Sequence, residues 1–301
     1  MAKFQYYNIQ VLPLNVNTHG FIGKDGYDFI FKELKELSDK NYAVRRLHID
    51  AYKLPQSIFY LATYALRLKL NYVTGKFLKF DRPDQIQNLY TTAVTYTVKK
   101  EESVYRHEIY FMFDSKSHVM AIDASQGRLP SVDRVIVFLE TTLSPVVKRL
   151  FPDYLLTTNV LASAQDLETV LESATAYKRV EADVTYSNAS LFSQKLLREI
   201  DNEHKENQIT SIVHVEKSAR DSVMLAPTKY AKALLKLATS LGRASIRYLN
   251  AEHKWQNYES ADSPVSEQVN KIKTETQEQY EGKVYESIKR AKLKALPSEE
   301  S

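Results

Sequence analysis

The stretch that decides the fold is residues 177–250, which read YKRVEADVTYSNASLFSQKLLREIDNEHKENQITSIVHVEKSARDSVMLAPTKYAKALLKLATSLGRASIRYLN. Its beginning alternates apolar and polar side chains, the period-two pattern of a strand with one buried face, and the apolar members are Val180, Ala182 and Val184. A second alternation covers residues 209–215, and a third covers residues 244–249. The stretch therefore predicts three strands.

Two helices are expected between these strands. Apolar residues recur at three- and four-residue spacing over residues 191–200, and Asn188 or Ser190 could provide the N-cap oxygen. Pro227 suits the first turn of the second helix, and Gly242 stands where a left-handed C-cap would end it. Because a strand-helix-strand unit usually crosses over to a parallel neighbour, we expect a compact sheet with both helices on one face.

The chain before this stretch predicts an antiparallel meander with helices. A strand is expected over residues 4–14, then a helix over residues 27–37 and a strand over residues 42–49. Ser131 is expected to cap a helix that runs to Arg149. The remaining strands and the tight turns between them are expected at residues 66–73, 76–80, 89–98, 105–113, 119–124 and 154–161, with turns at Thr74-Gly75 and residues 114–117.

The chain after this stretch predicts a long amphipathic helix. Pro264 could start it, and it would extend through residue 296 with apolar residues at helical spacing. Such a stripe needs a cover, either from the rest of the chain, from a second copy in a homodimer or from a partner protein. Residues 297–301 should fray.

These elements give an α+β fold with three parts. Residues 1–175 form an N-terminal domain with an antiparallel meander sheet and helices. Residues 176–258 form a βαβαβ domain, which is half of a ferredoxin-like fold. Residues 259–301 form the C-terminal amphipathic helix and its frayed tail. The length of 301 residues is long enough for more than one hydrophobic core.

Composition excludes several classes of protein. The chain has no cysteine, which excludes disulfides, thiolate catalysis and cysteine-ligated metal sites. Its longest aliphatic and aromatic run, residues 135–139, is far shorter than the ~20 residues of a membrane span. The N-terminus lacks the apolar region of a signal peptide. We therefore expect a cytoplasmic protein that does not enter a membrane.

Positive charge and tyrosine are concentrated in the meander. A sheet face with Arg or Lys beside Tyr can pair with phosphates and offer bases a stacking surface. A solvated face with tyrosines between core and water would have the same composition, and a basic helix end can simply complement the helix dipole. The candidate nucleic-acid-binding residues are Arg67, Lys69, Lys76, Lys79, Tyr96, Lys99, Lys100 and Arg106 in the meander, and Lys289, Arg290 and Lys292 in the C-terminal helix.

No motif specifies a reaction. The seven histidines include no HxH, HxxxH or HExxH spacing. His107, Asp114, His118 and Asp123 lie near one hairpin, but alternation places His107 in the wall of a sheet. A metal-dependent nuclease would need converging carboxylates and a lysine, and the nearest fragments, Glu181-Ala182-Asp183 and Glu216-Lys217, are generic. We assign no catalytic residue, no metal and no cofactor.

Three segments resemble an uncharacterised bacterial family of domain-of-unknown-function proteins found in accessory genomes. They are YYNIQVLPL at residues 6–14, EIYFMFDSKSHVMAID at residues 108–123 and YKRVEADVTYSNASLF at residues 177–192. The Tyr186-Ser187-Asn188 junction resembles a Pro-Asn turn of that family, with serine in place of proline. The plan is also similar to RexA-type phage-exclusion proteins. This resemblance covers residues 4–258 and implies DNA binding and a role in defence against phage.

Three functions follow as hypotheses. The first is a nucleic-acid-binding accessory or sensor protein of an anti-phage or mobile-element system, which salt-dependent binding to DNA and RNA would test. The second is a non-enzymatic homodimeric interaction scaffold that binds itself or a partner through residues 264–296, which the mass of a chain ending at Asp262 would test. The third is a metal-dependent nuclease, which a cleavage assay would test.

Overall fold

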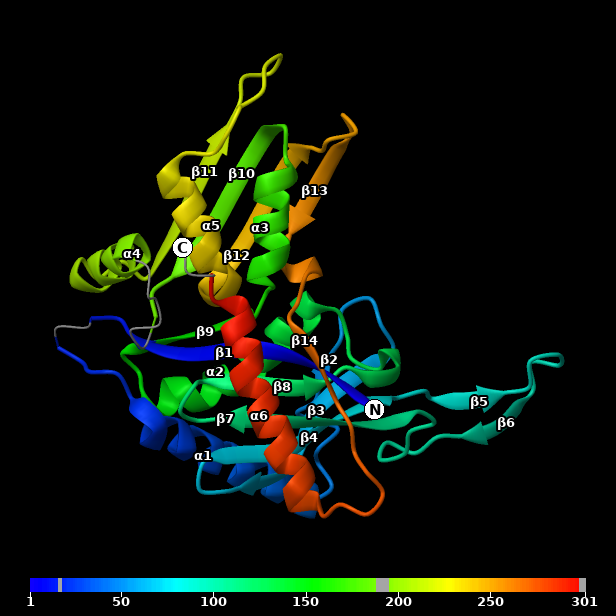
Figure 1. The fold of residues 1–301 in the computed structure, drawn as a ribbon. Helices are drawn as coiled ribbons and strands as arrows, with labels where there is room; N and C mark the ends of the chain where they lie inside the picture. The colour runs from blue at the N-terminus through cyan, green and yellow to red at the C-terminus, as the bar shows by residue number, and fades with distance from the viewer. Residues whose placement is uncertain (16–17, 188–194, 298–301) are drawn as a thin grey trace.

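The computed structural model describes residues 1–15, 18–187 and 195–297, and it confirms the α+β fold class. Figure 1 shows a large sheet in the lower half of the molecule and a smaller sheet above it. Helix α6 crosses one face of the large sheet, and helices α3 and α5 lie along the smaller one. No described helix is long and apolar enough to cross a bilayer.

The large sheet confirms the antiparallel meander. Its strand order is β14-β1-β8-β7-β4-β3-β2, and β9 also pairs with β1. Every pair is antiparallel. The strands are β1 (Ala2–Pro13), β2 (Tyr52–Lys53), β3 (Phe59–Leu68), β4 (Tyr72–Asp81), β7 (Arg106–Asp114), β8 (Val119–Asp123), β9 (Tyr154–Val160) and β14 (Ser266–Val269).

Both faces of the large sheet are covered. Helices α1 (Gly23–Ala43) and α2 (Val132–Leu150) pack on the face that carries Tyr7, Phe111 and Phe113. Helix α6 (Gln277–Ala295) packs on the face that carries Phe4 and Tyr6. Tyr6 and Tyr7 enter different cores because successive side chains of a strand point to opposite faces. This explains why β1 is buried along nearly its whole length.

The small sheet confirms the three strands expected in residues 177–250. Its order is β11-β10-β12-β13, formed by β10 (Ala176–Thr185), β11 (Ser211–Lys217), β12 (Gly242–Leu249) and β13 (Trp255–Glu259). The expected parallel pairing of neighbours is wrong, because β10 pairs antiparallel with both β11 and β12. Strands β11 and β12 therefore run in the same direction with β10 between them, so the crossover helix skips one strand.

The helices of the small sheet differ in position. α5 (Lys229–Leu241) packs on β10 and β12, together with α3 (Ala164–Ser173), around a core that includes Leu234 and Leu237. α4 (Lys195–Glu206) contacts α5 through this core with Leu197 and Ile200. The chain leaves β10 and enters β11 at the same end of the sheet, so α4 does not cross it. The expected N-cap, Asn188 or Ser190, lies outside the described residues.

Two glycines have roles other than the expected turns. Gly242 is no left-handed C-cap, because its φ of −179° is extended and it is the first residue of β12. Gly75 lies within β4, where an added Cβ would come within 2.5 Å of the Phe111 ring. The turn between β3 and β4 is instead closed by the backbone bond from Lys69 N to Tyr72 O, 2.9 Å. Each glycine lets a neighbouring group lie where a Cβ would clash: the β10 backbone at Gly242 and the Phe111 ring at Gly75.

The expected strand over residues 42–49 is also wrong. Helix α1 continues to Ala43, and the backbone N–H of Arg46 donates to the carbonyl of Asn41 at 2.7 Å. Arg45 follows in the left-handed region with a φ of 54°. These bonds satisfy the last carbonyls of the helix and turn the chain back. The remaining short elements are η1 (Ser125–Gly127), η2 (Ser260–Asp262) and the strands β5 (Gln85–Gln87) and β6 (Val94–Thr97).

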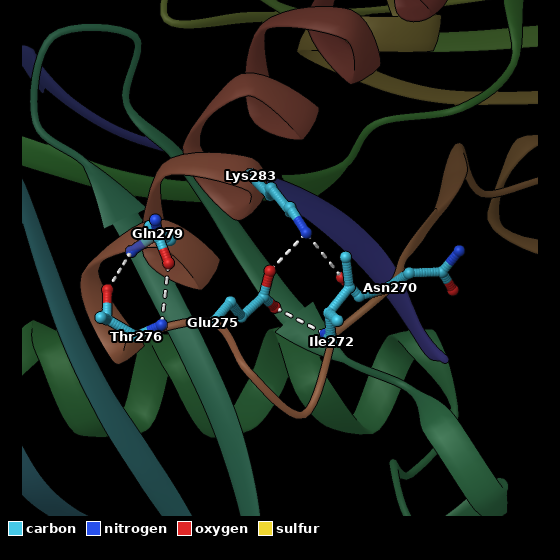
Figure 2. A network of polar contacts seen from close by, with 6 residues as sticks. All are labelled: Asn270, Ile272, Glu275, Thr276, Gln279 and Lys283. Carbon is cyan, nitrogen blue, oxygen red and sulfur yellow. Dashed lines mark hydrogen bonds and ion pairs between the residues drawn. The ribbon is translucent and has the colours of Figure 1, made fainter.

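The C-terminal helix starts later than expected. Val265 and Val269 are four residues apart, which suits one face of a strand as well as one face of a helix, and β14 pairs with the start of β1. Helix α6 begins after Thr276, whose hydroxyl accepts from Gln279 N at 3.2 Å while the Gln279 side chain accepts from Thr276 N at 2.9 Å (Figure 2). Figure 2 also shows Lys283 reaching back to Glu275 and to the Asn270 carbonyl. Before this capping box, the spacing of the apolar residues is compatible with a strand as well as with a helix, so it does not locate the start of the helix.

The environment of His118 in the β7–β8 hairpin leads us to expect that the folded protein loses stability at acidic pH. It stacks on Tyr27 at 4.3 Å, and burial, with a smaller contribution from Lys292, lowers its pKa to about 4. An unfolded histidine has a pKa of about 6.5. Between these values the unfolded chain binds a proton that the folded chain excludes, so we expect stability to fall as the pH decreases through this window, by up to about 3 kcal/mol.

Urea unfolding at several pH values checks this expectation. The matched variant is His118→Asn, because asparagine tolerates the left-handed backbone that His118 adopts at a φ of 60°. Its stability should depend less on pH between about 6.5 and 4 than that of the wild type. Identical pH profiles would contradict a buried, neutral His118.

Candidate nucleic-acid interface

The lysines of β4 lie on opposite faces of the sheet. Lys76 Nζ lies 2.5 Å from a carboxylate oxygen of Glu108. Lys79 Nζ donates to the Arg128 carbonyl at 2.9 Å and lies 4.9 Å from the centre of the Phe59 ring. Burial lowers the pKa of Lys79. The two lysines are three positions apart in the strand, so period-two alternation places them on opposite faces. They do not form one surface.

The other meander residues gather at two ends of the sheet. Arg67 pairs in register with Thr74, whereas Arg106 pairs with Phe80. Thr74 and Phe80 are separated by about 20 Å along β4. Arg67 and the neighbouring Lys69 therefore lie far from Lys99, Lys100 and Arg106, and the basic meander is two separate patches.

The patch at the Arg106 end surrounds a pocket of about 270 Å³. Its charged lining comprises four cationic side chains and two carboxylates, namely Arg45, Arg82, Lys100, Arg106, Glu101 and Glu102. We call this the basic pocket. Arg45 lies 3.5 Å from Glu101, and Arg106 lies 2.9 Å from Glu108. No carboxylate of the described residues pairs with Lys100.

Three segments that are distant in the sequence position these cations. The left-handed turn at Arg45 folds the end of α1 toward the ends of β4 and β7. The Arg82 guanidinium lies 5.4 Å from the centre of the Tyr60 ring and donates to the His48 carbonyl at 3.3 Å. The Arg106 guanidinium lies 6.0 Å from the centre of the Tyr64 ring. Contacts between cations and aromatic rings hold the guanidinium groups at the rim of the pocket.

A two-stranded hairpin projects from the basic pocket. It consists of residues 85–97, which we call the arm, and Figure 1 shows it extending away from both sheets. Strands β5 and β6 pair only with each other and are exposed throughout. The side chains of Leu89 and Tyr90 at its tip are 93% and 94% exposed. The expected single strand over residues 89–98 is therefore this turn and the second strand of the arm.

Two carboxylates fix the base of the arm. Glu102 accepts from the Tyr96 hydroxyl at 2.6 Å and from Lys99 N at 2.9 Å, and the bond from Tyr96 lowers the pKa of Glu102. Asp81 Oδ1 accepts from Ser103 Oγ at 2.7 Å and from the backbone N–H of the two following residues. These bonds orient the segment that carries Lys99 and Lys100 next to the pocket.

The C-terminal cations form a separate, largely paired group. Lys289 lies 2.8 Å from Glu286, and Arg290 lies 3.0 Å from Glu267. Lys292 is mostly buried, which lowers its pKa. Glu267 belongs to β14, which is four strand spacings, or about 19 Å, from β4. The structure therefore does not bring these residues to the basic pocket.

The apolar stripe of α6 is covered by the chain itself. Tyr280, Val284 and Ile288 are buried with Phe4 and Tyr6 of β1. The stripe thus needs no second copy to cover it. Homodimerisation through residues 264–296 stays a prediction without support from this face.

Asp114 and Asp123 of the hairpin bond to the turns that follow them. Asp114 accepts from Lys116 N at 3.0 Å and from Ser117 Oγ at 2.6 Å, and Asp123 accepts from Ser125 N at 2.8 Å. Both carboxylates thus cap turns. Within the described ranges, no three His, Asp or Glu side chains gather where they could hold a metal ion. The nuclease hypothesis stays a prediction.

Sequence reasoning missed part of the basic pocket. Arg45 and His48 lie in the segment expected to be a strand, and Arg82 is not among the candidate residues of the meander. The paired Arg45-Arg46 directly after an amphipathic helix was the available signal. Of the selected residues, the structure brings Lys100 and Arg106 into the pocket, with Lys99 and Tyr96 beside it.

The comparison with known proteins identifies the family. A family described as a domain of unknown function (DUF4747) matches residues 7–290, which includes both sheets, the arm and most of α6. No curated protein matches the sequence. The expected membership of an uncharacterised family is confirmed by this match over most of the chain. The chain belongs to the DUF4747 family.

Proposed function

We propose that the chain binds nucleic acid through the basic pocket, as an accessory or sensor protein of an anti-phage or mobile-element system. The observation that carries the proposal is the convergence of Arg45, Arg82, Lys100 and Arg106 on one pocket beside a projecting arm. Guanidinium groups pair with phosphates in a bidentate manner, and a lysine adds a mobile positive charge. The defence context is an expectation from the sequence resemblance alone, and the family match does not extend to it.

The carboxylates of the pocket leave room for a phosphate. Glu102 is already bonded to Tyr96 and to the backbone of Lys99. Among the residues that the structure describes, Glu101 is bonded only through its exposed pair with Arg45 at 3.5 Å. An exposed ion pair contributes about 0–1 kcal/mol, so a phosphate can displace Glu101 from Arg45 at little cost. Lys100 and Arg82 would complete the contact.

Charge reversal next to the pocket tests the proposal. We expect Lys99→Glu with Lys100→Glu to weaken binding to duplex DNA by about tenfold or more, and to reduce the dependence of log affinity on log salt by about one to two. With each phosphate contact that is lost, fewer counterions leave the DNA on binding, so the slope of log affinity against log salt becomes smaller. Fluorescence anisotropy over a salt series measures both quantities.

The matched control carries the same change of net charge on a distant surface. Lys195 and Arg198 are exposed on α4, so Lys195→Glu with Arg198→Glu should leave affinity and salt slope near the wild-type values. If the two double variants behave alike, the basic pocket is not the binding site. If the wild type binds neither DNA nor RNA at low salt, the proposed function is wrong.

A further inference from the structure

We propose that the arm enters the major groove of duplex DNA while the basic pocket holds the adjacent phosphates. This inference rests on the proposed function and specifies its ligand as duplex DNA. The arm is an isolated two-stranded ribbon, and such a hairpin is only marginally stable in water. Its exposed apolar and aromatic side chains and its projection from the molecule indicate a surface that is completed by a partner.

The composition of the arm favours contact with bases. Residues 85–97 contain no charged side chain, in a chain of which 26% of the residues are charged. They consist mainly of glutamine, asparagine, threonine, tyrosine and aliphatic residues. Glutamine and asparagine can form paired hydrogen bonds with the N6 and N7 edge of adenine, and threonine can contact either base edges or the thymine methyl group. Arg82 stands three positions before this neutral segment, with Asp84 between them, and Lys99 and Lys100 follow the segment after Val98.

The register of the arm begins with a polar pair and shifts between Ile86 and Gln87, and Gln87 pairs with Val94. Gln85 pairs with Thr97, whereas the next pair, Ile86 with Tyr96, is apolar. Side chains that are directly opposite in an antiparallel pair share a face, so Gln85 and Thr97 lie on one face and Ile86 on the other. The side-chain amides of Gln85 and Gln87 form no hydrogen bond with the described residues. They are free to bind a ligand.

Asn88 stabilises the turn at the tip of the arm. The Asn88 side chain accepts from Tyr90 N at 2.9 Å and from Thr91 N at 3.0 Å, and Asn88 N donates to the Ala93 carbonyl at 2.9 Å. A preorganised loop loses little entropy on binding. The turn projects Leu89 and Tyr90 into solvent, where they can contact base edges and thymine methyl groups.

The dimensions of the ribbon distinguish between duplexes. The major groove of B-form DNA is about 12 Å wide and accepts a two-stranded ribbon. The major groove of an RNA helix is deep and too narrow for side chains to read. A two-stranded ribbon that contacts bases in the major groove therefore selects duplex DNA over duplex RNA, whereas a pocket that binds only phosphates would accept both.

The experiment compares arm variants on defined duplexes. The probes are duplex DNAs of about 20 base pairs, one rich in A·T and one rich in G·C, and the RNA duplex that corresponds to the first. The arm variant is Gln85→Ala with Gln87→Ala in the full-length chain. The matched control is Gln256→Ala with Asn257→Ala, which removes two exposed amides from β13.

We expect the wild type to bind the A·T-rich DNA about tenfold more tightly than the RNA duplex. The arm variant should lose most of this preference while its affinity for RNA stays unchanged, because the phosphate contacts remain. The control should behave as the wild type. Tyr90→Ala should weaken duplex DNA binding in the same direction, which shows that the tip also takes part.

Several results would overturn the inference. Equal affinity of the wild type for DNA and RNA duplexes, or arm variants that match the control, would exclude groove reading. A change in solution mass of the arm variants without a change in DNA affinity would make the arm a self-association element instead. If these results occur while Lys99→Glu with Lys100→Glu still weakens binding, only the role of the arm is wrong. If that double variant also has no effect, the proposed function fails as well.

Discussion

Replacement of Gly242 by alanine is expected to lower the free energy of unfolding by about 3 kcal/mol or more. A Cβ at this position would lie 1.8 Å from the Asp183 carbonyl oxygen and 3.0 Å from Val184 Cα. Both neighbours are backbone atoms of β10, which pairs with β12 at this point, so no side-chain rotation can relieve the overlap. The strands would have to separate where the core of the small sheet is fully buried.

Gly282 provides the matched control for this substitution. It lies inside α6, and an added Cβ would meet no atom within 4 Å. Gly282→Ala should therefore stabilise the protein by about 0.5–1 kcal/mol, because alanine favours the helix. Urea unfolding compares the two variants, and hydrogen exchange of the β10 and β12 amides locates the damage. A Gly242→Ala protein as stable as the wild type would show that the strands are not held at this distance.

Gly242, expected as a helix C-cap and found at the start of β12, illustrates how far the fold could be predicted. Alternation of side chains located the strands β10, β11 and β12 within a few residues. Strands β10 and β12 have one face in the core, whereas in β11 Val213 and Val215 are exposed and only Ile212 packs partly against the core. The same sequence could not show which backbone would lie opposite the glycine. Pairing partners depend on contacts between distant segments, and β10 lies between two strands that a local rule would have placed side by side.

The basic pocket was predictable only in part for a similar reason. Composition identified the meander as basic, and Lys100 and Arg106 were selected on that ground. Whether a cation stays available depends on carboxylates that are distant in the sequence, such as Glu108 beside Lys76 and Glu267 beside Arg290. The left-handed turn at Arg45, which adds another cation to the pocket, has no glycine to signal it. A count of charges therefore finds the region but not the site.

A chain that ends at Asp262 is expected to unfold or aggregate, because it lacks β14 and α6. These elements cover Phe4, Tyr6 and Met112, which are completely buried in the full-length protein. Burial of one large apolar side chain contributes about 1.5–3 kcal/mol, so the loss over this face is on the order of 10 kcal/mol. That is comparable with the whole stability of a typical domain, about 5–15 kcal/mol. Its mass would therefore report exposure of the core and not the oligomeric state of the native protein.

Single substitutions on α6 test whether this helix is part of the core in a protein that still folds. Ile288 is completely buried, whereas the Leu293 side chain is 69% exposed. Ile288→Ala should cost about 2–5 kcal/mol, and Leu293→Ala should change stability by less than about 0.5 kcal/mol. Urea unfolding measures both, and light scattering of the Leu293 variant tests whether the exposed side of the helix joins two copies. Equal losses of stability, or a cooperatively folded chain ending at Asp262, would mean that α6 is an appendage and not part of the core.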